Sequence, residues 1–350
     1  MPNPVLTAAI DALASGHDLP ADQTAGVLAE IMNGNASEVE TAAVLVGLRT
    51  KGETVDEIVG LARTMRAFAT PVRVGRDDLI DTAGTGGGRQ TFNVSTTAAL
   101  IAAGAGCAVA KHGNRSATSQ SGSADVLEAL GVRIDLGPED VRRCIEGVGF
   151  GFMFAPAHHR ATRHVVAVRK ELAVRTIFNF LGPLTNPAGA ARQVIGVSDP
   201  RFLETIAGAV AKLGAVKAMV VASEDGLDEL SVSGATTVVE VDRGALRSYT
   251  VTPEAVGLER SAFEAVQGGP PAANADTARR VFAGETGPRR DLAALNAGAA
   301  IYVAGRADTL EAGVRAAEAA LDDGRAARAL DRLVALTQEL TRSTPDGVPA

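Results

Sequence analysis

The sequence predicts an α/β protein with a small N-terminal helical domain and a larger α/β domain built on a mostly parallel central sheet. Three observations support this prediction. The first 70 residues carry apolar side chains at helical spacing, residues 79–222 alternate short apolar runs with helical segments, and residues 274–340 are alanine-rich and helical. We expect a helical domain over residues 1–72, with a later helical contribution near 170–190, and an α/β domain over 73–345.

The composition restricts the class of protein. Of the 350 residues, 46% are apolar and only 3% aromatic, so the core is expected to consist of alanine, valine, leucine and isoleucine. A net charge of −7 argues against a basic nucleic-acid-binding surface. Cys107 and Cys144 are expected to be buried thiols in a reducing compartment. Without a signal peptide or a long apolar run, a cytoplasmic protein is expected.

Helical spacing and capping signals predict a small bundle at the N-terminal end. A first helix is expected over residues 22–33. Ser37 and Glu40 have the S-x-x-E spacing of a capping box, which opens a second helix. Thr54 and Glu57 repeat this spacing at the start of a third helix. Three short helices with short connections predict a bundle.

From residue 79 onwards, short apolar runs and helical segments alternate. This alternation predicts parallel strands covered by helices. The two runs 236–241 and 246–251 predict an antiparallel pair near an edge of the sheet. The other expected elements are strands at 79–82, 107–111, 148–154, 194–198 and 218–222, and helices at 96–103, 123–130, about 158–172 and 201–213.

A glycine-rich segment follows the first expected strand. Residues 81–96 have the sequence DTAGTGGGRQTFNVST and lead into a helix. Glycines let the backbone approach a ligand closely, and the N–H groups at a helix start favour an anion such as phosphate. Asn93, Ser95 and Thr96 add side-chain donors there. The alternative is a plain turn with a helix cap.

A second polar segment follows the next strand. Residues 111–123 have the sequence KHGNRSATSQSGS, with two cations, an amide, an imidazole and five hydroxyls in 13 positions. This density of donors suits a phosphorylated ligand. Because loops that follow parallel strands meet at one edge of the sheet, we expect both segments to face the same crevice.

An acidic turn follows the strand at 218–222. Asp228 and Glu229 are adjacent carboxylates in the sequence DGLDE, a pattern that suits Mg²⁺, although a solvated turn has the same composition. Elsewhere in the chain, Arg163, Arg169 and Arg175 are candidates to bind a carboxylate. The three histidines of residues 158–164 lack partners at metal-ligand spacing, which favours structural or surface roles.

Several common catalytic motifs are missing from the sequence. There is no G-x-S-x-G nucleophile elbow, and no Gly-Lys-Ser/Thr completes a phosphate-binding P-loop. The dinucleotide-binding pattern G-x-G-x-x-G fails because Arg89 stands where its third glycine belongs. The glycine-rich segment therefore matches neither the dinucleotide-binding loop nor the P-loop.

Six motifs, taken together and in order, resemble one enzyme family. They are GTGG at 84–87, TFNVST at 91–96, KHGNRS at 111–116, SGSADVLE at 121–128, TIFNFLGPLTNP at 176–187 and DE at 228–229. The chain resembles the anthranilate phosphoribosyltransferases over about residues 5–340. The resemblance implies a transfer of the 5-phosphoribosyl group from phosphoribosyl diphosphate to the amine of anthranilate, in tryptophan biosynthesis. It also implies a homodimer joined through the helical domain, with the substrates between the domains.

The resemblance assigns roles to individual residues. It implies three Mg²⁺ ligands, Ser95, Asp228 and Glu229, and three anthranilate contacts, Gly84, Asn114 and Arg169. No dedicated catalytic residue is expected, because the aromatic amine is neutral at pH 7 and needs no strong base. The positions implied to bind phosphoribosyl diphosphate are Gly84, Gly87, Gly88, Thr91, Asn93, Val94, Ser95, Thr96, Lys111, His112, Gly113, Asn114, Arg115, Ser116, Ala117, Thr118, Ser119 and Ser123.

The chain departs from the family pattern in one loop. The family continues Gly-Thr-Gly-Gly-Asp-Gly, whereas Gly88-Arg89-Gln90 here is one residue shorter and lacks the aspartate. We hypothesise that Arg89 faces a phosphate or closes over the loop. In a milder departure, Thr162 stands where some members carry an aromatic residue.

Two alternative functions share the expected architecture. A pyrimidine nucleoside phosphorylase is one, but those chains are longer and their loops differ from the KHGNR segment. A non-catalytic nucleic-acid-binding relative is the other, and it predicts a basic surface and loss of the acidic pair. The charge of −7 and the presence of Asp228 and Glu229 argue against it.

Overall fold

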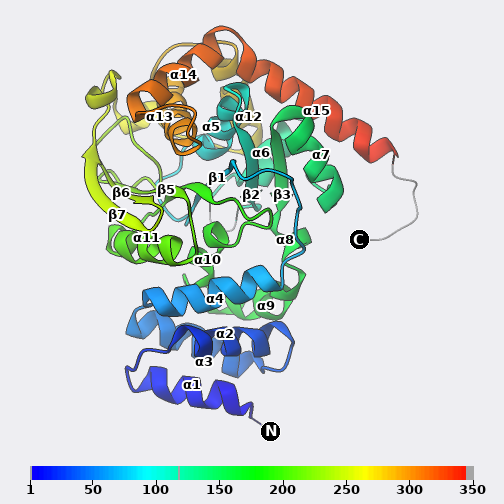
Figure 1. Ribbon diagram of the computed structural model, residues 1–350, viewed down its shortest axis with the longest axis vertical. Coiled ribbons are helices and arrows are strands. Elements are labelled where there is room, and N and C mark those ends of the chain that lie inside the picture. Colours follow the sequence, from blue (N-terminus) through cyan, green and yellow to red (C-terminus); the bar gives the residue numbers. More distant parts are fainter. Residues whose placement is uncertain (1, 117–118, 344–350) are drawn as a thin grey trace.

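The computed structural model describes residues 2–116 and 119–343, and it confirms the predicted fold class. A stack of helices carries the N-terminus, and an α/β part lies against one end of that stack (Figure 1). Within the described residues, no helix combines the length and the apolar character that crossing a membrane requires.

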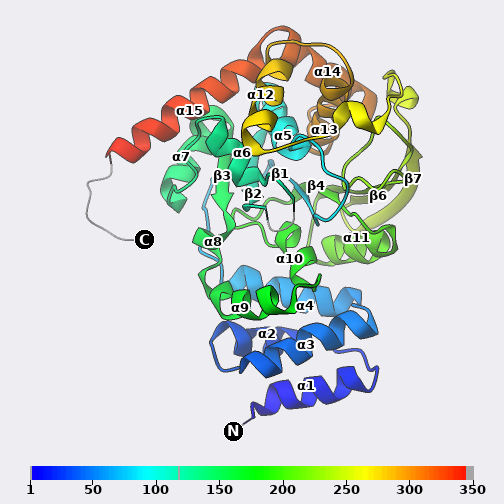
Figure 2. The same cartoon turned by 180° about the vertical axis from the view of Figure 1, so that it is seen from behind.

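The N-terminal helices form because their starts are capped and their apolar faces pack together. Both predicted capping boxes are present, Ser37 with Glu40 and Thr54 with Glu57. Two later helices join this group, and α10 lies between α4 and the sheet (Figures 1 and 2). The members of the group are α1 (Pro4–Ala14), α2 (Ala21–Met32), α3 (Glu38–Lys51), α4 (Val55–Ala67), α9 (Arg163–Leu172) and α10 (Phe178–Leu184).

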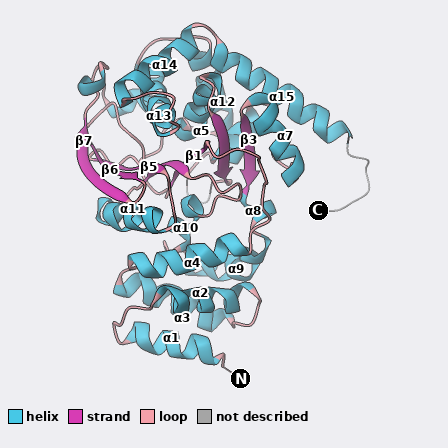
Figure 3. Ribbon diagram, viewed as in Figure 1, coloured by secondary structure: helices cyan, strands magenta, loops and turns pink. Residues whose placement is uncertain are grey.

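A seven-stranded sheet with the order β3-β2-β1-β4-β5-β6-β7 forms the centre of the larger part (Figure 3). The first five strands in the chain are parallel, and β6 and β7 continue as the predicted antiparallel pair at one edge. The strand order reverses between β1 and β4, and a small pocket lined by Thr82, Gly196 and Glu229 lies at the ends of these strands. The strands are β1 (Leu79–Gly84), β2 (Ala108–Gly113), β3 (Phe150–Phe154), β4 (Arg192–Gly196), β5 (Lys217–Ser223), β6 (Thr236–Asp242) and β7 (Ala245–Val251).

Successive residues of a strand point to opposite faces, so the sheet separates two hydrophobic cores. On β5, Met219 and Val221 pack in one core with α5 and α13, whereas Ala218 and Val220 pack in the other with α11 and the N-terminal helices. Both cysteines are buried, as expected. The remaining helices are α5 (Val94–Gly104), α6 (Ser123–Ala129), α7 (Pro138–Val148), α8 (Ala155–His158), α11 (Leu203–Lys212), α12 (Pro271–Phe282), α13 (Pro288–Val303), α14 (Leu310–Asp322) and α15 (Arg325–Ser343).

The structure corrects three expectations about individual elements. Helices α1 and α7 were not predicted, and α7 occupies the first residue of the strand expected at 148–154. The helix expected at about 158–172 is interrupted at His159, between α8 and a 3₁₀ turn over Arg160–Thr162. Its first part is held by a hydrogen bond between His158 Nδ1 and the Thr70 carbonyl, so tertiary contacts override the helical spacing.

Helix α9 ends in a backbone conformation that glycine prefers. Ala173 has φ 50° and ψ 26°, in the left-handed region, and its side chain is exposed. We predict that Ala173→Gly raises the free energy of unfolding by roughly 0.5–1 kcal/mol, because the left-handed region costs an L-residue about 1–2 kcal/mol and the extra freedom of unfolded glycine offsets part of this gain. Urea unfolding measures the change.

The matched control is Ala335→Gly, at an exposed interior position of α15. At this position the substitution is expected to lower the free energy of unfolding by about 1 kcal/mol, because the backbone is helical. Equal destabilisation by both substitutions would contradict the prediction.

Candidate active site

The glycine-rich loop after β1 is fixed from two sides. The Gly86 N–H donates to Asp228 Oδ2 at 2.9 Å. The Gly86 carbonyl accepts hydrogen bonds from Arg175 Nη2 at 2.8 Å and from Ser198 Oγ at 2.9 Å. Since Gly86 and Gly87 have φ angles of 69° and 81°, the turn needs glycine at both positions.

The acidic turn after β5 packs directly against glycines. A Cβ atom at Gly84 would lie 2.5 Å from Asp228 Oδ2, and one at Gly88 would lie 2.7 Å from Asp228 Oδ1. At Gly196, at the end of β4, a Cβ atom would overlap the Asp228 carbonyl oxygen at 1.6 Å. The absence of side chains on these three glycines therefore brings the Asp228–Glu229 pair against the loop.

Lys111 is a buried cation at the end of β2. Its side chain is 1% exposed, and its Nζ donates to the Thr82 carbonyl at 2.5 Å, with Thr82 Oγ1 at 3.3 Å and Ser95 Oγ at 3.5 Å. Burial lowers the pKa of Lys111, and the charges of Asp81 and Glu229 oppose that shift. The ammonium group thus connects β1, β2 and the start of α5.

Asp81 and Asn186 form a second buried contact beneath the loops. The Asp81 carboxylate accepts hydrogen bonds from Asn186 Nδ2 at 2.7 Å and from the His112 N–H at 3.2 Å. Asn186 Nδ2 also donates to the Ala110 carbonyl at 2.8 Å. Burial raises the pKa of Asp81, while Lys111 lowers it. Asn186 therefore connects its loop to β1 and β2, a role that no local sequence signal indicated.

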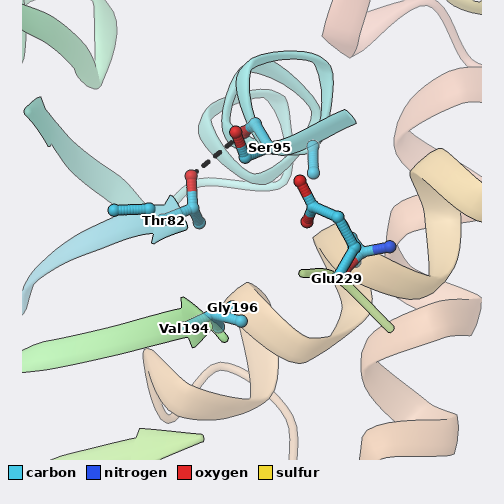
Figure 4. Close-up of a pocket in the computed structure, with 8 residues that line it drawn as sticks. Thr82, Ser95, Val194, Gly196 and Glu229 are labelled. Atoms are coloured by element: carbon cyan, nitrogen blue, oxygen red, sulfur yellow. Dashed lines mark hydrogen bonds between the residues drawn. The ribbon is translucent and has the colours of Figure 1, made fainter. Parts of the chain in front are cut away.

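Glu229 faces the start of α5 inside a small pocket. Thr82, Ser95, Gly196 and Glu229 line this pocket, and Figure 4 shows the Glu229 carboxylate directed toward Ser95. Burial and the neighbouring Asp228 raise the pKa of Glu229 to about 8, and a hydrogen bond from the Ser95 N–H offsets part of that shift. The Glu229 carboxylate and the Ser95 hydroxyl are oxygen donors of the kind that Mg²⁺ binds, and Asp228 is adjacent to Glu229 in the chain.

Asn296 of α13 holds the backbone that follows the acidic pair. Its Oδ1 accepts from the Leu230 N–H at 3.0 Å, and its Nδ2 donates to the Leu230 carbonyl at 2.9 Å. The asparagine is buried and lines the same pocket as Glu229. Asn296 was not among the predicted site residues, because a single asparagine in an alanine-rich helix has no distinguishing pattern.

The loop after β2 folds back on itself through its polar side chains. Ser123 Oγ donates to the Asn114 carbonyl and accepts from its N–H, both at 3.2 Å. Ser116 Oγ lies 2.6 Å from Ser119 Oγ. The two loops meet where Asn93 Nδ2 donates to the Ser121 carbonyl at 2.9 Å. Two further positions implied to bind phosphoribosyl diphosphate, Ala117 and Thr118, lie outside the described residues.

Not every implied position points its side chain into the crevice. Arg115 is ion-paired with Asp125 and Glu128 of α6, so its guanidinium is already engaged. The side chain of Val94 is fully buried in the hydrophobic core, so only its backbone could contact a ligand. His112, Gly113 and Thr91 lie at the ends of β2 and of the glycine-rich loop.

Arg89, the residue that departs from the family pattern, closes over the neighbouring loops. Its guanidinium carbon lies 3.4 Å from the centroid of the Phe263 ring, and Nη2 lies 3.8 Å from Glu264. Its side chain also covers Gly226, and its N–H donates to the Gly226 carbonyl at 3.1 Å. Arg89 was hypothesised either to face a phosphate or to close over the loop, and in the structure it lies over the loop.

Arg169 is a partly buried cation on α9. Its guanidinium lies 5.3 Å from the centroid of the Phe178 ring, and burial lowers its pKa. Among the described residues, no carboxylate lies within ion-pair distance of it. By contrast, Arg163 on the same helix is exposed. Arg175, the third candidate, is bound to Gly86 and Ser198 and thus supports the glycine-rich loop.

Three buried histidines lie beside the crevice. His112 and His159 have ring centroids 5.0 Å apart, and His112 Nδ1 lies 3.0 Å from the Gly182 carbonyl. Within the described residues, the Nε2 atoms of His112, His158 and His159 have no hydrogen-bond partner. No group of three or more potential histidine, cysteine or carboxylate metal ligands occurs in the described part of the chain.

Comparisons with known proteins agree over nearly all of the chain. Two family models match, "Glycosyl transferase family, helical bundle domain" over residues 7–69 and "Glycosyl transferase family, a/b domain" over residues 76–327. The anthranilate phosphoribosyltransferase of Rubrobacter xylanophilus is 52% identical over 338 residues, which cover 96% of this chain and 98% of the relative.

Two solved structures extend this similarity to three dimensions. An anthranilate phosphoribosyltransferase from Thermus thermophilus has a TM-score of 0.90 at 48% identity, covering 94% of this chain and 99% of its own. One from Saccharomyces cerevisiae, in complex with PRPP and Mg, has a TM-score of 0.88 at 26% identity, covering 95% of this chain and 98% of its own.

The buried histidines predict a loss of stability in acid. Burial lowers the pKa of His112 to about 3 and that of His159 to about 4, from an ordinary value of 6.5. Below pH 6.5 these histidines bind protons in the unfolded chain but not in the native state. Their contribution to the free energy of unfolding is therefore complete above pH 6.5 and is lost as the pH falls toward 4. Each group contributes a slope of up to about 1.4 kcal/mol per pH unit.

Urea unfolding at pH 7, 6 and 5 measures this slope. We expect His159→Gln to make it shallower, while His17→Gln, at an exposed position, leaves it unchanged. If the free energy of unfolding of His159→Gln falls with pH as steeply as that of the wild type, the prediction is wrong.

Proposed function

The chain belongs to the anthranilate phosphoribosyltransferase family, and we propose that its crevice transfers the 5-phosphoribosyl group of phosphoribosyl diphosphate to the amine of anthranilate, releasing diphosphate. The observation that carries this proposal is the buried Lys111 ammonium, which lies between two polar loops and close to the Glu229 carboxylate. A site with one fixed cation, exposed loop donors and an acidic pair suits a phosphorylated donor that arrives with a divalent cation.

We propose that the donor lies across the two loops at the carboxyl ends of β1 and β2. The start of α5 and the glycine-rich loop would present N–H groups to its phosphates, because a helix start carries partial positive charge. Buried hydroxyls without partners in the described structure, Thr96 Oγ1 and Ser121 Oγ, remain as donors. Apart from Ser121, the proposed set is the one that the resemblance implies, with Arg115 and Val94 contributing through their backbone.

Ser95, Asp228 and Glu229 would hold Mg²⁺ together with oxygens of the donor. When bound, the ion would neutralise charge on the departing diphosphate. Asp228 already accepts the Gly86 N–H, so the same carboxylate connects the metal position to the glycine-rich loop. The acidic pair is therefore placed by backbone contacts that are independent of the ion.

The reaction needs no dedicated base in this proposal. The bond from the anomeric carbon to the diphosphate oxygen breaks as the amine nitrogen bonds to that carbon, and the resulting ammonium then loses a proton to water or diphosphate. Positive charge develops on the ribose, while Lys111 and the α5 start stabilise the departing negative charge. The two loops supply the rest of the acceleration by positioning the reactants.

We propose that anthranilate binds beside this donor, with its carboxylate on Arg169 and its ring near Gly84 and Asn114. The support is that Arg169 is a partly buried guanidinium with no carboxylate partner among the described residues. His112 and His159 lie next to each other nearby and are held neutral by burial, so they add polar atoms without adding charge.

We also propose a cytoplasmic homodimer joined through the helical domain. Val39 on α3 is 79% exposed, Val46 on α3 is 41% exposed and Val5 on α1 is 39% exposed. Such exposed apolar side chains on neighbouring helices support a contact between two copies.

The proposed activity predicts anthranilate consumption that depends on both phosphoribosyl diphosphate and Mg²⁺. The fluorescence of anthranilate reports its consumption directly. We expect turnover with both present, and loss of turnover after chelation of the metal that Mg²⁺ restores. If anthranilate is not consumed at any Mg²⁺ concentration, the proposal is wrong.

The acceptor role of Arg169 predicts a selective defect. Arg169→Ala should raise the KM for anthranilate at least about tenfold, because a charge-assisted hydrogen bond is worth about 1.5–3 kcal/mol, and should change the KM for phosphoribosyl diphosphate far less. Arg163→Ala on the same helix is the matched control and should resemble the wild type. Equal effects of Arg169→Ala on both KM values would exclude a carboxylate-binding role.

A further inference from the structure

Asn274 lies outside the residues assigned so far, yet it contacts the phosphate loops. It belongs to the first turn of α12 and is 2% exposed. Its Oδ1 accepts the Gly269 N–H at 2.8 Å, and its Nδ2 donates to Asn93 Oδ1 at 2.8 Å. In both views of the molecule, α12 lies beside α5 and α6, the helices that follow the two loops (Figures 1 and 2).

The partner of Asn274 has an unusual backbone. Asn93 has φ 64° and ψ 52°, in the left-handed region, immediately before α5. Its carbonyl accepts the N–H groups of Thr96 and Thr97, and its Nδ2 donates to the Ser121 carbonyl at 2.9 Å. Asn93 therefore opens α5 and also joins the glycine-rich loop to the loop after β2.

One backbone N–H fixes the orientation of both amides. Because Gly269 donates, Asn274 must place its oxygen toward Gly269 and its NH₂ group toward Asn93. Asn93 must then place its oxygen toward Asn274, which directs its NH₂ group to the Ser121 carbonyl. The second hydrogen of that NH₂ group has no protein partner in the described residues and remains for a ligand.

The segment before Asn274 also lies along the glycine-rich loop. Gln267 and Thr91 form an isolated antiparallel bridge, and a Cβ atom at Gly268 would lie 2.1 Å from the Thr91 carbonyl oxygen. The stacking of Arg89 on Phe263 adds a side-chain contact between the same two segments. Residues 263–274 thus support residues 89–93 over their full length.

We propose that Asn274 is a positioning residue for the phosphoribosyl diphosphate site, which acts by orienting the Asn93 amide and holding the two phosphate loops together. This inference rests on the proposed function, because it takes the ligand between the loops to be the phosphoribosyl donor. It assigns a binding role to a residue of α12 that contacts no reacting group.

The test uses Asn274→Asp, which can still accept the Gly269 N–H but, when ionised, cannot donate to Asn93. We expect the KM for phosphoribosyl diphosphate to rise about tenfold, the effect of losing one well-placed hydrogen bond, while the KM for anthranilate changes less than about twofold. Calorimetric titration of the folded variant with phosphoribosyl diphosphate and Mg²⁺ should show the same loss of affinity without turnover.

Two comparisons separate positioning from general destabilisation. Thr277→Val, which removes another buried polar group of α12 whose hydroxyl accepts a hydrogen bond from Arg289 Nη1 at 3.3 Å, should leave both KM values unchanged. Asn93→Ala and the double variant Asn93→Ala with Asn274→Asp should have equal affinities for the donor, because Asn274 acts through Asn93.

Wild-type affinity of Asn274→Asp for the donor, equal changes in both KM values, or additive effects in the double variant would overturn the inference. If the aspartate variant does not fold, Asn274→Ala, which likewise cannot donate to Asn93, is tested by the same criteria. If the proposed function itself is wrong, the wild-type protein does not consume anthranilate. That result differs from every outcome that would overturn the role of Asn274 alone.

Discussion

The burial of the Lys111 ammonium is the constraint on which the arrangement of the site depends. A lone buried charge costs several kcal/mol, so the ammonium must be surrounded by oxygen atoms held in place. Thr82 on β1 and Ser95 on α5 supply them, and the nearby carboxyl groups of Asp81 and Glu229 oppose the lowering of the Lys111 pKa by burial. The relative positions of β1, β2 and α5 therefore follow from the need to solvate one side chain. The same side chain places a buried cation beside the end of β1 and the start of α5.

Near this cation, the acidic turn after β5 packs directly against the backbone of glycine residues, which have no side chains to separate the segments. Gly84, Gly88 and Gly196 let the acidic turn after β5 lie directly on the glycine-rich loop, where larger side chains would collide with Asp228. The turn is then held from behind by Asn296. The Glu229 carboxylate faces Ser95 in the small pocket, and these contacts hold the backbone on either side of Glu229. We propose that this arrangement supplies the preorganisation that stabilisation of a leaving group needs. Arg89 adds a further contact to this loop by stacking on Phe263.

The sequence predicted those features that carry a local pattern. The two capping boxes, the antiparallel edge pair and the alternation of strands and helices are encoded in residues a few positions apart, and the structure contains each of them. The supporting asparagines have no such pattern. Asn186, Asn296 and Asn274 contact partners 105, 66 and 181 positions away, so their importance depends on tertiary contacts that periodicity does not report. The prediction of a continuous helix through His159 failed for the same reason, because a contact with Thr70 decides the backbone there.

The most direct test of this account is calorimetric titration of Lys111→Met with phosphoribosyl diphosphate and Mg²⁺. Methionine keeps the length of the side chain and removes its charge. Lys217→Met is the matched control, because Lys217 also lies on a strand of the sheet but contacts Glu240 and Tyr302 instead of the loops. With both variants verified as folded by circular dichroism, we predict that Lys111→Met loses at least about a hundredfold in affinity for the donor, equivalent to about 2.7 kcal/mol, whereas the control binds as the wild type does. Wild-type affinity in Lys111→Met would contradict the central role of the buried cation.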